Sequence, residues 1–147
     1  YSNNMKSIYT CIWTPHSPIE MESFYRSIFK ESKTLSSNLN MVQMEIHQFR
    51  FMILGGANES AENLTHSWII ECDDQQEIDY YWDALSQDGL QRQCGWLTDR
   101  YGITWQIIPK ILGQLMSPPN NGKKVQAAFL KMKKMDIAAL LTASKEI

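Results

Sequence analysis

Short apolar runs alternate along this chain with segments whose apolar residues have helical spacing. The first run, Thr10–Trp13, ends just before Pro15 and predicts a β-strand. In the segment that follows, Ser17 and Pro18 favour the N-cap and the first turn of a helix. The apolar residues of that helix are Ile19, Phe24, Tyr25 and Ile28. The beginning of the chain therefore predicts a strand followed by a helix.

The same order of patterns occurs again after a shift of 57 residues, which places Thr10 on Ser67. The run Ser67–Ile70 predicts a second strand, and Asp73 or Asp74 is expected to cap a second helix. Further positions coincide under the same shift: Trp13 with Ile70, Phe24 with Tyr81, Tyr25 with Trp82, and Ile28 with Leu85. The chain thus contains either an internal repeat or a chance similarity between two amphipathic strand–helix segments.

Strand-like segments follow each strand–helix pair. They are Thr34–Leu39, Val42–His47 and Phe49–Leu54 in the first half, and Gln91–Leu97 and Ile103–Ile108 in the second. One further weak strand in the second half has no clear position. An Asp-x-x-Gly turn at Asp99 and Gly102 leads into the last strand. Two tandem strand–helix–strand–strand–strand (βαβββ) modules are the simplest account of this order.

The C-terminal part of the chain predicts helices only. A short helical piece at 110–116 and a breaker-rich loop at 117–122 precede one or two helices within 123–143. Their apolar stripe either docks on the body or covers a neighbouring subunit, and the lysine-rich run 131–135 is expected on a solvated helix face. We therefore expect one domain over 1–147, with a first module at 5–56, a second at 64–109 and a helical tail at 110–147.

Composition narrows the class of protein. The chain has 147 residues, 44% of them apolar and 20% charged, as in ordinary globular proteins. A net charge of −2 gives no reason to expect nucleic acid or a membrane surface as a partner. The N-terminal segment lacks the features of a signal peptide and Met5 would make a natural start, so we expect a cytoplasmic protein. Three scattered cysteines predict neither a disulfide framework nor a zinc site.

Three segments carry a resemblance to a known family. They are SWIIECDDQQEIDYYWDALS at 67–86, CGWLTDRYGITWQIIP at 94–109 and MKKMDIAAL at 132–140. These segments resemble the vicinal oxygen chelate superfamily of glyoxalase I, bleomycin-resistance proteins and extradiol dioxygenases. Within it they are similar to the PhnB-like branch, also called 3-demethylubiquinone 3-methyltransferase-like. The resemblance extends from about Tyr9 to Leu141.

The resemblance implies an α+β, glyoxalase-like fold. Tandem βαβββ modules would form a cupped, mostly antiparallel eight-stranded sheet, with helices outside, a ligand cavity within and a C-terminal helical tail. It also implies a homodimer. If Gln106 points into the cup, alternation along the strands places several candidate ligand-binding residues beside it. These candidates are Thr10, Ile12, Met52, Ser67, Ile69, Glu71, Trp96, Thr104 and Gln106. Cys11, Trp13, Trp68 and Cys72 would then pack beneath the helices.

The metal-binding positions of the superfamily correspond here to Thr10, Met52, Ser67 and Gln106. Divalent first-row metals prefer imidazole, carboxylate or thiolate ligands, which these four side chains do not supply, so we predict no metal. His66 would need a slip of one residue, which moves it to the opposite face of its strand. We also predict no S-adenosylmethionine or other cofactor, because the double glycine at 55–56 does not lead into a helix.

Single residues leave alternatives open. Glu71 is the candidate for a catalytic carboxylate or is a solvated rim residue. Trp96 forms a pocket wall or a core contact, and Gln106 bonds either to a ligand or to Thr10 and Ser67. Cys94 is expected to be a structural thiol at a turn.

Three functions follow from this pattern. The first is a metal-free protein that binds a small, partly apolar molecule in the cup, of the resistance or sequestration type. The second is a glyoxalase-like enzyme, a lyase, dioxygenase or transferase, with an unknown substrate. The third is a regulatory or structural dimer.

Overall fold

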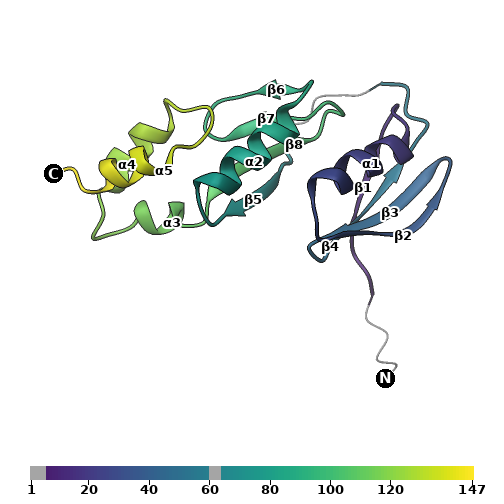
Figure 1. The fold of residues 1–147 in the computed structure, drawn as a ribbon, viewed down its shortest axis with the longest axis horizontal. Helices are drawn as coiled ribbons and strands as arrows, with labels where there is room; N and C mark the ends of the chain where they lie inside the picture. Colours follow the sequence, from purple (N-terminus) through teal and green to yellow (C-terminus); the bar gives the residue numbers. More distant parts are fainter. Residues whose placement is uncertain (1–5, 60–63) are drawn as a thin grey trace. The chain divides into compact units, whose positions relative to one another are not determined.

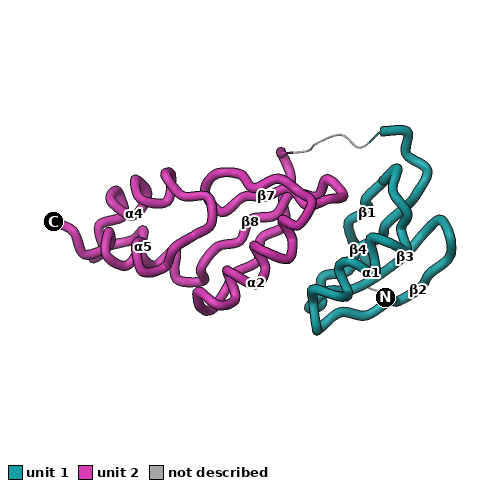
Figure 2. Tube along the Cα trace, turned by 45° about the horizontal axis from the view of Figure 1, so that its top comes forward, with its two compact units in different colours: residues 1–60 teal, residues 61–147 magenta. Residues whose placement is uncertain are grey.

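The computed structural model describes residues 6–59 and 64–147 (Figure 1). The expected start of the first module at Met5 lies outside the described residues. The chain divides into two compact units, residues 1–60 and 61–147 (Figure 2). Each unit contains one βαβββ module, so the predicted tandem repeat is confirmed as an order of elements.

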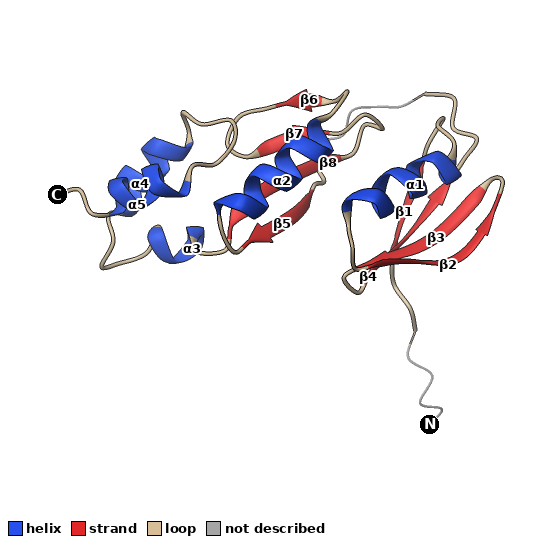
Figure 3. Ribbon diagram, viewed as in Figure 1, coloured by secondary structure: helices blue, strands red, loops and turns tan. Residues whose placement is uncertain are grey.

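The first unit is a four-stranded sheet with one helix against it. Its elements are β1 (Thr10–Trp13), α1 (Pro18–Ile28), β2 (Ser32–Asn38), β3 (Met41–Ile46) and β4 (Phe49–Leu54). The strand order is β1-β4-β3-β2, with β1 parallel to β4 and the other neighbours antiparallel. Helix α1 covers one face of this sheet, and the opposite face carries no element of the unit (Figure 3).

The second unit repeats this arrangement and adds the tail. Its elements are β5 (Trp68–Cys72), α2 (Gln75–Ser86), β6 (Leu90–Gln91), β7 (Trp96–Thr98), β8 (Thr104–Pro109), α3 (Leu112–Leu115), α4 (Gly122–Phe129) and α5 (Ile137–Ser144). The strand order β5-β8-β7-β6 and the parallel β5–β8 pair match the first unit. In the described part of the chain the eight strands thus form two separate sheets, not one closed cup.

Local signals in the sequence explain both module helices. The Ser17 side chain accepts a hydrogen bond from the Glu20 N–H at 3.3 Å, and Asp74 accepts one from the Glu77 N–H at 2.9 Å. These side chains satisfy N–H groups that the first turn of a helix leaves unpaired. Three buried residues of each helix lie 57 positions apart: Met21, Tyr25 and Ile28 in α1, and Ile78, Trp82 and Leu85 in α2. The shift of 57 residues is therefore correct for the helices.

The same shift is wrong by one residue for the opening strands. In the parallel pairs, Cys11 lies beside Met52 and Ile69 lies beside Gln106, so the strands correspond after 58 residues. The cause is the spacing between each opening strand and its N-cap: Ser17 follows Cys11 by six positions, whereas Asp74 follows the equivalent Ile69 by five. A one-residue slip moves every side chain of a strand to the other face.

This slip corrects the predicted faces of β1. Thr10 and Ile12 share the face of Phe51 and Ile53, which is the helix-covered side of the sheet. Cys11 and Trp13 lie instead on the open face, and the Trp13 side chain is 66% exposed. The predicted packing of Cys11 and Trp13 beneath the helix is therefore wrong.

Two other expectations need correction. The expected strand at 91–97 consists of two short strands, β6 and β7, separated by a turn in which Cys94 and Gly95 both have positive φ. The lysine-rich run 131–135 is not a helix face but the connection between α4 and α5, and within it Met135 is buried. This connection is fixed to the turn before β7, because Cys94 and Gly95 donate backbone hydrogen bonds to Met132 and Lys133.

Candidate functional site

The open face of the second sheet brings together most of the predicted site. Gln106 is at its centre on β8, with Ile69 of β5 beside it on one side and Trp96 of β7 on the other. Its side-chain amide donates a hydrogen bond to the Ser67 hydroxyl, from Nε2 to Oγ, at 2.9 Å. Of the partners considered for Gln106, Ser67 is thus bonded to it, and this bond fixes the orientation of the amide on this face.

Two more predicted residues lie on the same face. Glu71 is next to Ile108 in the β5–β8 register and is exposed, whereas Thr104 is buried at the opposite end of β8. The side chain of Ile69 is 55% exposed, so an apolar group at the middle of the face remains open to a ligand. Six of the nine candidate residues therefore share one surface, formed by Ser67, Ile69, Glu71, Trp96, Thr104 and Gln106.

The other three candidates belong to the first sheet. Met52 lies on its open face, half-buried, next to Cys11 and Gln43. Thr10 and Ile12 lie on the helix-covered side, so the register separates them from Met52.

Sequence analysis missed a polar cluster on this open face of the first sheet. The Arg50 guanidinium carbon lies 4.0 Å from the centre of the Tyr9 ring, and Arg50 Nη2 donates to Gln43 Oε1 at 2.7 Å. Alternation from Met52 would have placed Arg50 on the open face. The incorrect register of β1, however, placed Tyr9 on the opposite face, so the contact between the two residues was not predicted.

A buried carboxylate shapes the turn before β8. Asp99 accepts hydrogen bonds from the Tyr101 and Ile103 N–H groups through Oδ1 and from the Trp105 indole N–H through Oδ2. The ring of Trp105 also packs edge-on against Trp68 of β5, with ring centres 5.0 Å apart. These contacts fix the helix-covered side of β8 and thereby hold Gln106 on the other side.

The residues at the expected metal positions do not fit a divalent ion. Ser67 and Gln106 supply neutral oxygen donors only, and the corrected register adds the thiol of Cys11 beside Met52. Among residues 6–59 and 64–147, no group of three or more histidine, cysteine, aspartate or glutamate side chains is placed to hold a metal. His66 directs Nδ1 to the Thr65 hydroxyl at 3.1 Å.

The cysteines have different environments. Cys72 is 1% exposed, and its burial, together with the charges of Glu77, Asp73 and Asp74, raises the pKa of the thiol to about 12. A thiol with so high a pKa is a poor nucleophile at neutral pH. Cys94 is half-buried in its turn and Cys11 is exposed.

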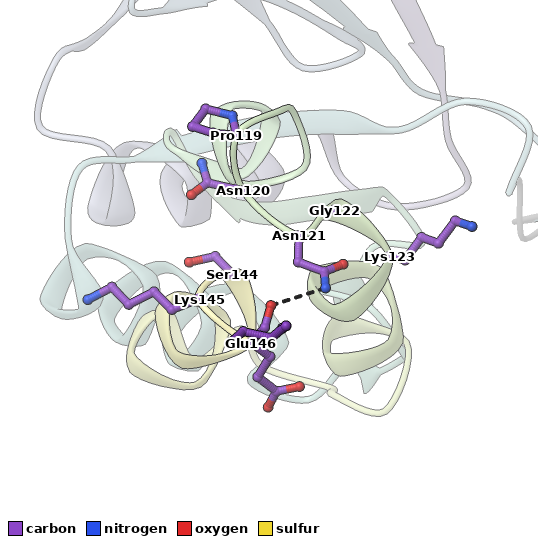
Figure 4. Close-up of a pocket in the computed structure, with 9 residues that line it drawn as sticks. Pro119, Asn120, Asn121, Gly122, Lys123, Ser144, Lys145 and Glu146 are labelled. Carbon is purple, nitrogen blue, oxygen red and sulfur yellow. Dashed lines mark hydrogen bonds between the residues drawn. The ribbon is translucent and has the colours of Figure 1, made fainter.

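A hollow of about 720 Å³ lies in the tail, at the start of α4 and the end of α5 (Figure 4). Its edge is held by a hydrogen bond from Asn121 Nδ2 to the Glu146 carbonyl at 3.2 Å. Its lining consists of residues 119–123 and 144–147, so it includes none of the predicted site residues.

No described helix has the length and apolar character required to cross a bilayer.

Solved structures with a similar fold support the architecture. The PhnB protein of Bacillus cereus aligns with a TM-score of 0.62 and 22% identity, covering 71% of this chain and 99% of that one. The fosfomycin resistance protein FosX of Listeria monocytogenes, solved with Mn(II) and sulfate, aligns with a TM-score of 0.56 and 10% identity, covering 74% and 97%. A possible glyoxalase of Bacillus cereus aligns with a TM-score of 0.55 and 11% identity, covering 71% of this chain and 99% of that one. These similarities confirm the glyoxalase-like fold.

The comparison with curated proteins gave no significant match. A family model described as 3-demethylubiquinone-9 3-methyltransferase matches residues 6–108. The match ends in β8, so the predicted likeness of the tail up to Leu141 is not part of it. Because this family model covers more than half of the chain, the protein belongs to the family that it describes.

Proposed function

We propose that this protein binds a small, partly apolar molecule on the open face of the β5–β8–β7 sheet, without a metal ion. The observation that carries this proposal is the environment of Gln106, an oriented amide between Ile69 and Trp96. Ligand sites typically combine apolar and aromatic walls with a few fixed polar groups. A ligand on this face would cover the exposed part of Ile69 and accept or donate a hydrogen bond at Gln106.

A sequestering role suits this surface better than the chemistry in the family name. Methyl donors are commonly held where a glycine-rich turn joins a strand to a helix. The three described turns of this kind, residues 14–17, 73–74 and 110–111, contain no glycine. Catalysis of the metal-dependent kind would need ligands that the corresponding positions lack. Since FosX proteins are fosfomycin resistance proteins, binding of the resistance or sequestration type is the function that we favour.

Titration with Nile red, a neutral apolar dye, tests the binding surface. We expect saturable fluorescence enhancement with the wild-type protein and a loss of affinity of about tenfold in Ile69→Asp, because a charge then replaces the apolar contact. Leu130→Asp is the matched control, since Leu130 is also 55% exposed but lies in the tail. Equal affinity of all three proteins, or no saturable binding to the wild type, would contradict the proposal.

Native mass spectrometry tests the metal-free state. The protein is dialysed against EDTA and measured before and after one equivalent of MnCl₂ is added. We expect the same mass in both spectra. A stoichiometric gain of one manganese ion per chain would refute the metal-free part of the proposal and favour a glyoxalase-like enzyme.

A further inference from the structure

Two contacts fix the guanidinium of Arg50 on the open face of the first sheet. The Tyr9 ring stacks on its guanidinium at 4.0 Å, and Gln43 accepts a hydrogen bond from Nη2 at 2.7 Å. Stacking on an aromatic ring leaves the edge of the guanidinium plane available for hydrogen bonds. The side chain is therefore oriented in advance, which lowers the entropic cost of binding a ligand.

The hydrogen-bonding capacity of Arg50 is not used up by the protein. Its Nε atom is buried and has no hydrogen-bond partner among the described residues. Glu45 lies directly across from Arg50 in the β3–β4 register, yet the two side chains form no ion pair in the described part of the chain. A buried donor without an acceptor costs free energy, and such groups call for an explanation.

The neighbours of Arg50 define the rest of the surface. Met52 is two residues further along the same face of β4, and Cys11 of β1 lies beside it. Trp13, at the far end of the same face, is 66% exposed. The guanidinium of Arg50 thus lies at one end of a mainly apolar strip on the open face, which is about 13 Å long from Arg50 to Leu54.

From this arrangement we infer that the open face of the first sheet binds small molecules that carry an oxyanion, a carboxylate or phosphonate, on an apolar body. The Nη1 and Nη2 atoms of Arg50 receive the oxyanion, because Nε is buried, and Met52 and Cys11 contact the apolar part. Glu45 opposes any second negative charge on the ligand, so a single anionic group is favoured. This surface belongs to the first unit and shares no residue with the Gln106 surface of the second unit.

Phenylphosphonate, followed by ³¹P NMR, is the probe that tests this inference. We expect saturable binding to the wild type and an affinity at least about tenfold lower for Arg50→Gln, the loss typical of a charge-assisted hydrogen bond. Arg50→Lys should lose less, because it keeps the charge but not the fork. Arg26→Gln is the matched control, since Arg26 is an exposed arginine on α1 of the same unit.

Further measurements separate binding from folding. Tyr9→Leu keeps the charge of Arg50 but removes the stacked ring, and it should also weaken phenylphosphonate binding. Circular dichroism establishes whether each variant is folded. If Arg50→Gln is unfolded, the affinities of Arg50→Lys and Tyr9→Leu for phenylphosphonate test the inference in its place. Benzyl alcohol, the neutral comparison, should bind more weakly than phenylphosphonate and be insensitive to Arg50.

Either of two results would overturn the inference: no saturable binding of phenylphosphonate to the wild type, or equal affinity of the wild type and folded Arg50 variants. Both leave the Nile red result with Ile69→Asp unaffected. Failure of the anion site is therefore distinguishable from failure of the proposed function.

Discussion

At the scale of single residues, Cys72 shows how burial controls chemistry. It ends β5 with its side chain on the helix-covered side, close to the acidic start of α2. Desolvation and the carboxylates of Glu77, Asp73 and Asp74 all disfavour the thiolate, so the pKa rises from 9.0 to about 12. The result is a thiol that acts as a small apolar group of the core.

The raised pKa of Cys72 predicts that the folded protein loses stability at high pH. In the unfolded chain Cys72 ionises near pH 9, whereas in the folded protein it stays neutral until about pH 12. Its contribution to the free energy of unfolding is therefore complete below pH 9 and is lost as the pH rises toward 12. Urea unfolding at pH 8 and pH 10.5 should show a larger decrease in stability for the wild type than for Cys72→Ala.

Alkylation supplies an independent readout of the same property. At pH 8, iodoacetamide should modify the exposed Cys11 and leave Cys72 unmodified, as determined by peptide mass spectrometry. Rapid modification of Cys72 in the folded protein would show that the thiol is neither buried nor suppressed.

At the scale of elements, the helices were easier to predict than the faces of the strands. Ser17 with Pro18, and Asp74, are strong N-cap signals, and the apolar spacing behind them fixed both helices. The faces of β5 and β8 were also predicted correctly, which brought Ser67 and Gln106 together. The periodicity of a strand is two, so its face depends on a register that a longer turn can change without altering the apolar pattern.

This dependence of strand faces on register explains both the residues placed on the wrong face and the contact that was not predicted. One additional residue before Ser17 moved Thr10 and Ile12 to the helix-covered side and Cys11 and Trp13 to the open face. The Arg50–Tyr9 contact became visible only with the true register, because it joins β4 to the residue before β1, which is far away in sequence. Strands as short as β6, with two residues, carry too few positions for a pattern.

One side chain of α2 helps to attach the tail to the second module. Gln75 donates from Nε2 to the Met135 carbonyl at 2.9 Å and accepts from the Ile137 N–H at 2.9 Å. Gln75→Ala should therefore lower the free energy of unfolding by about 1–3 kcal/mol, since both backbone groups lose their partner. Hydrogen exchange should become faster in α5.

The adjacent Gln76 provides the matched control. It is exposed and lies at the next position of α2, so Gln76→Ala should change stability by less than about 0.5 kcal/mol. If the two variants were equally stable, and exchange in α5 were unchanged, the tail would have to be attached by its other contacts alone.

At the scale of the whole molecule, each sheet keeps one face free of its own elements, and both free faces carry exposed apolar side chains. Trp13 is 66% exposed on one and Ile69 is 55% exposed on the other. Exposed apolar surface of this kind often marks an interaction site. A homodimer, which the resemblance to the superfamily implies, would give these faces a partner. We therefore propose that the protein is a homodimer and that Trp13 lies within its interface.

Light scattering after size-exclusion chromatography tests this proposal. The expected mass is twice the 17.0 kDa of one chain. Trp13→Asp should shift the equilibrium toward the single chain, because burying a carboxylate in an apolar interface is unfavourable. Leu130→Asp, which changes an exposed apolar residue of the tail, should leave the mass doubled. A wild-type mass of one chain over the whole concentration range would contradict the dimer. A doubled mass for Trp13→Asp would instead show that Trp13 is not needed for the interface.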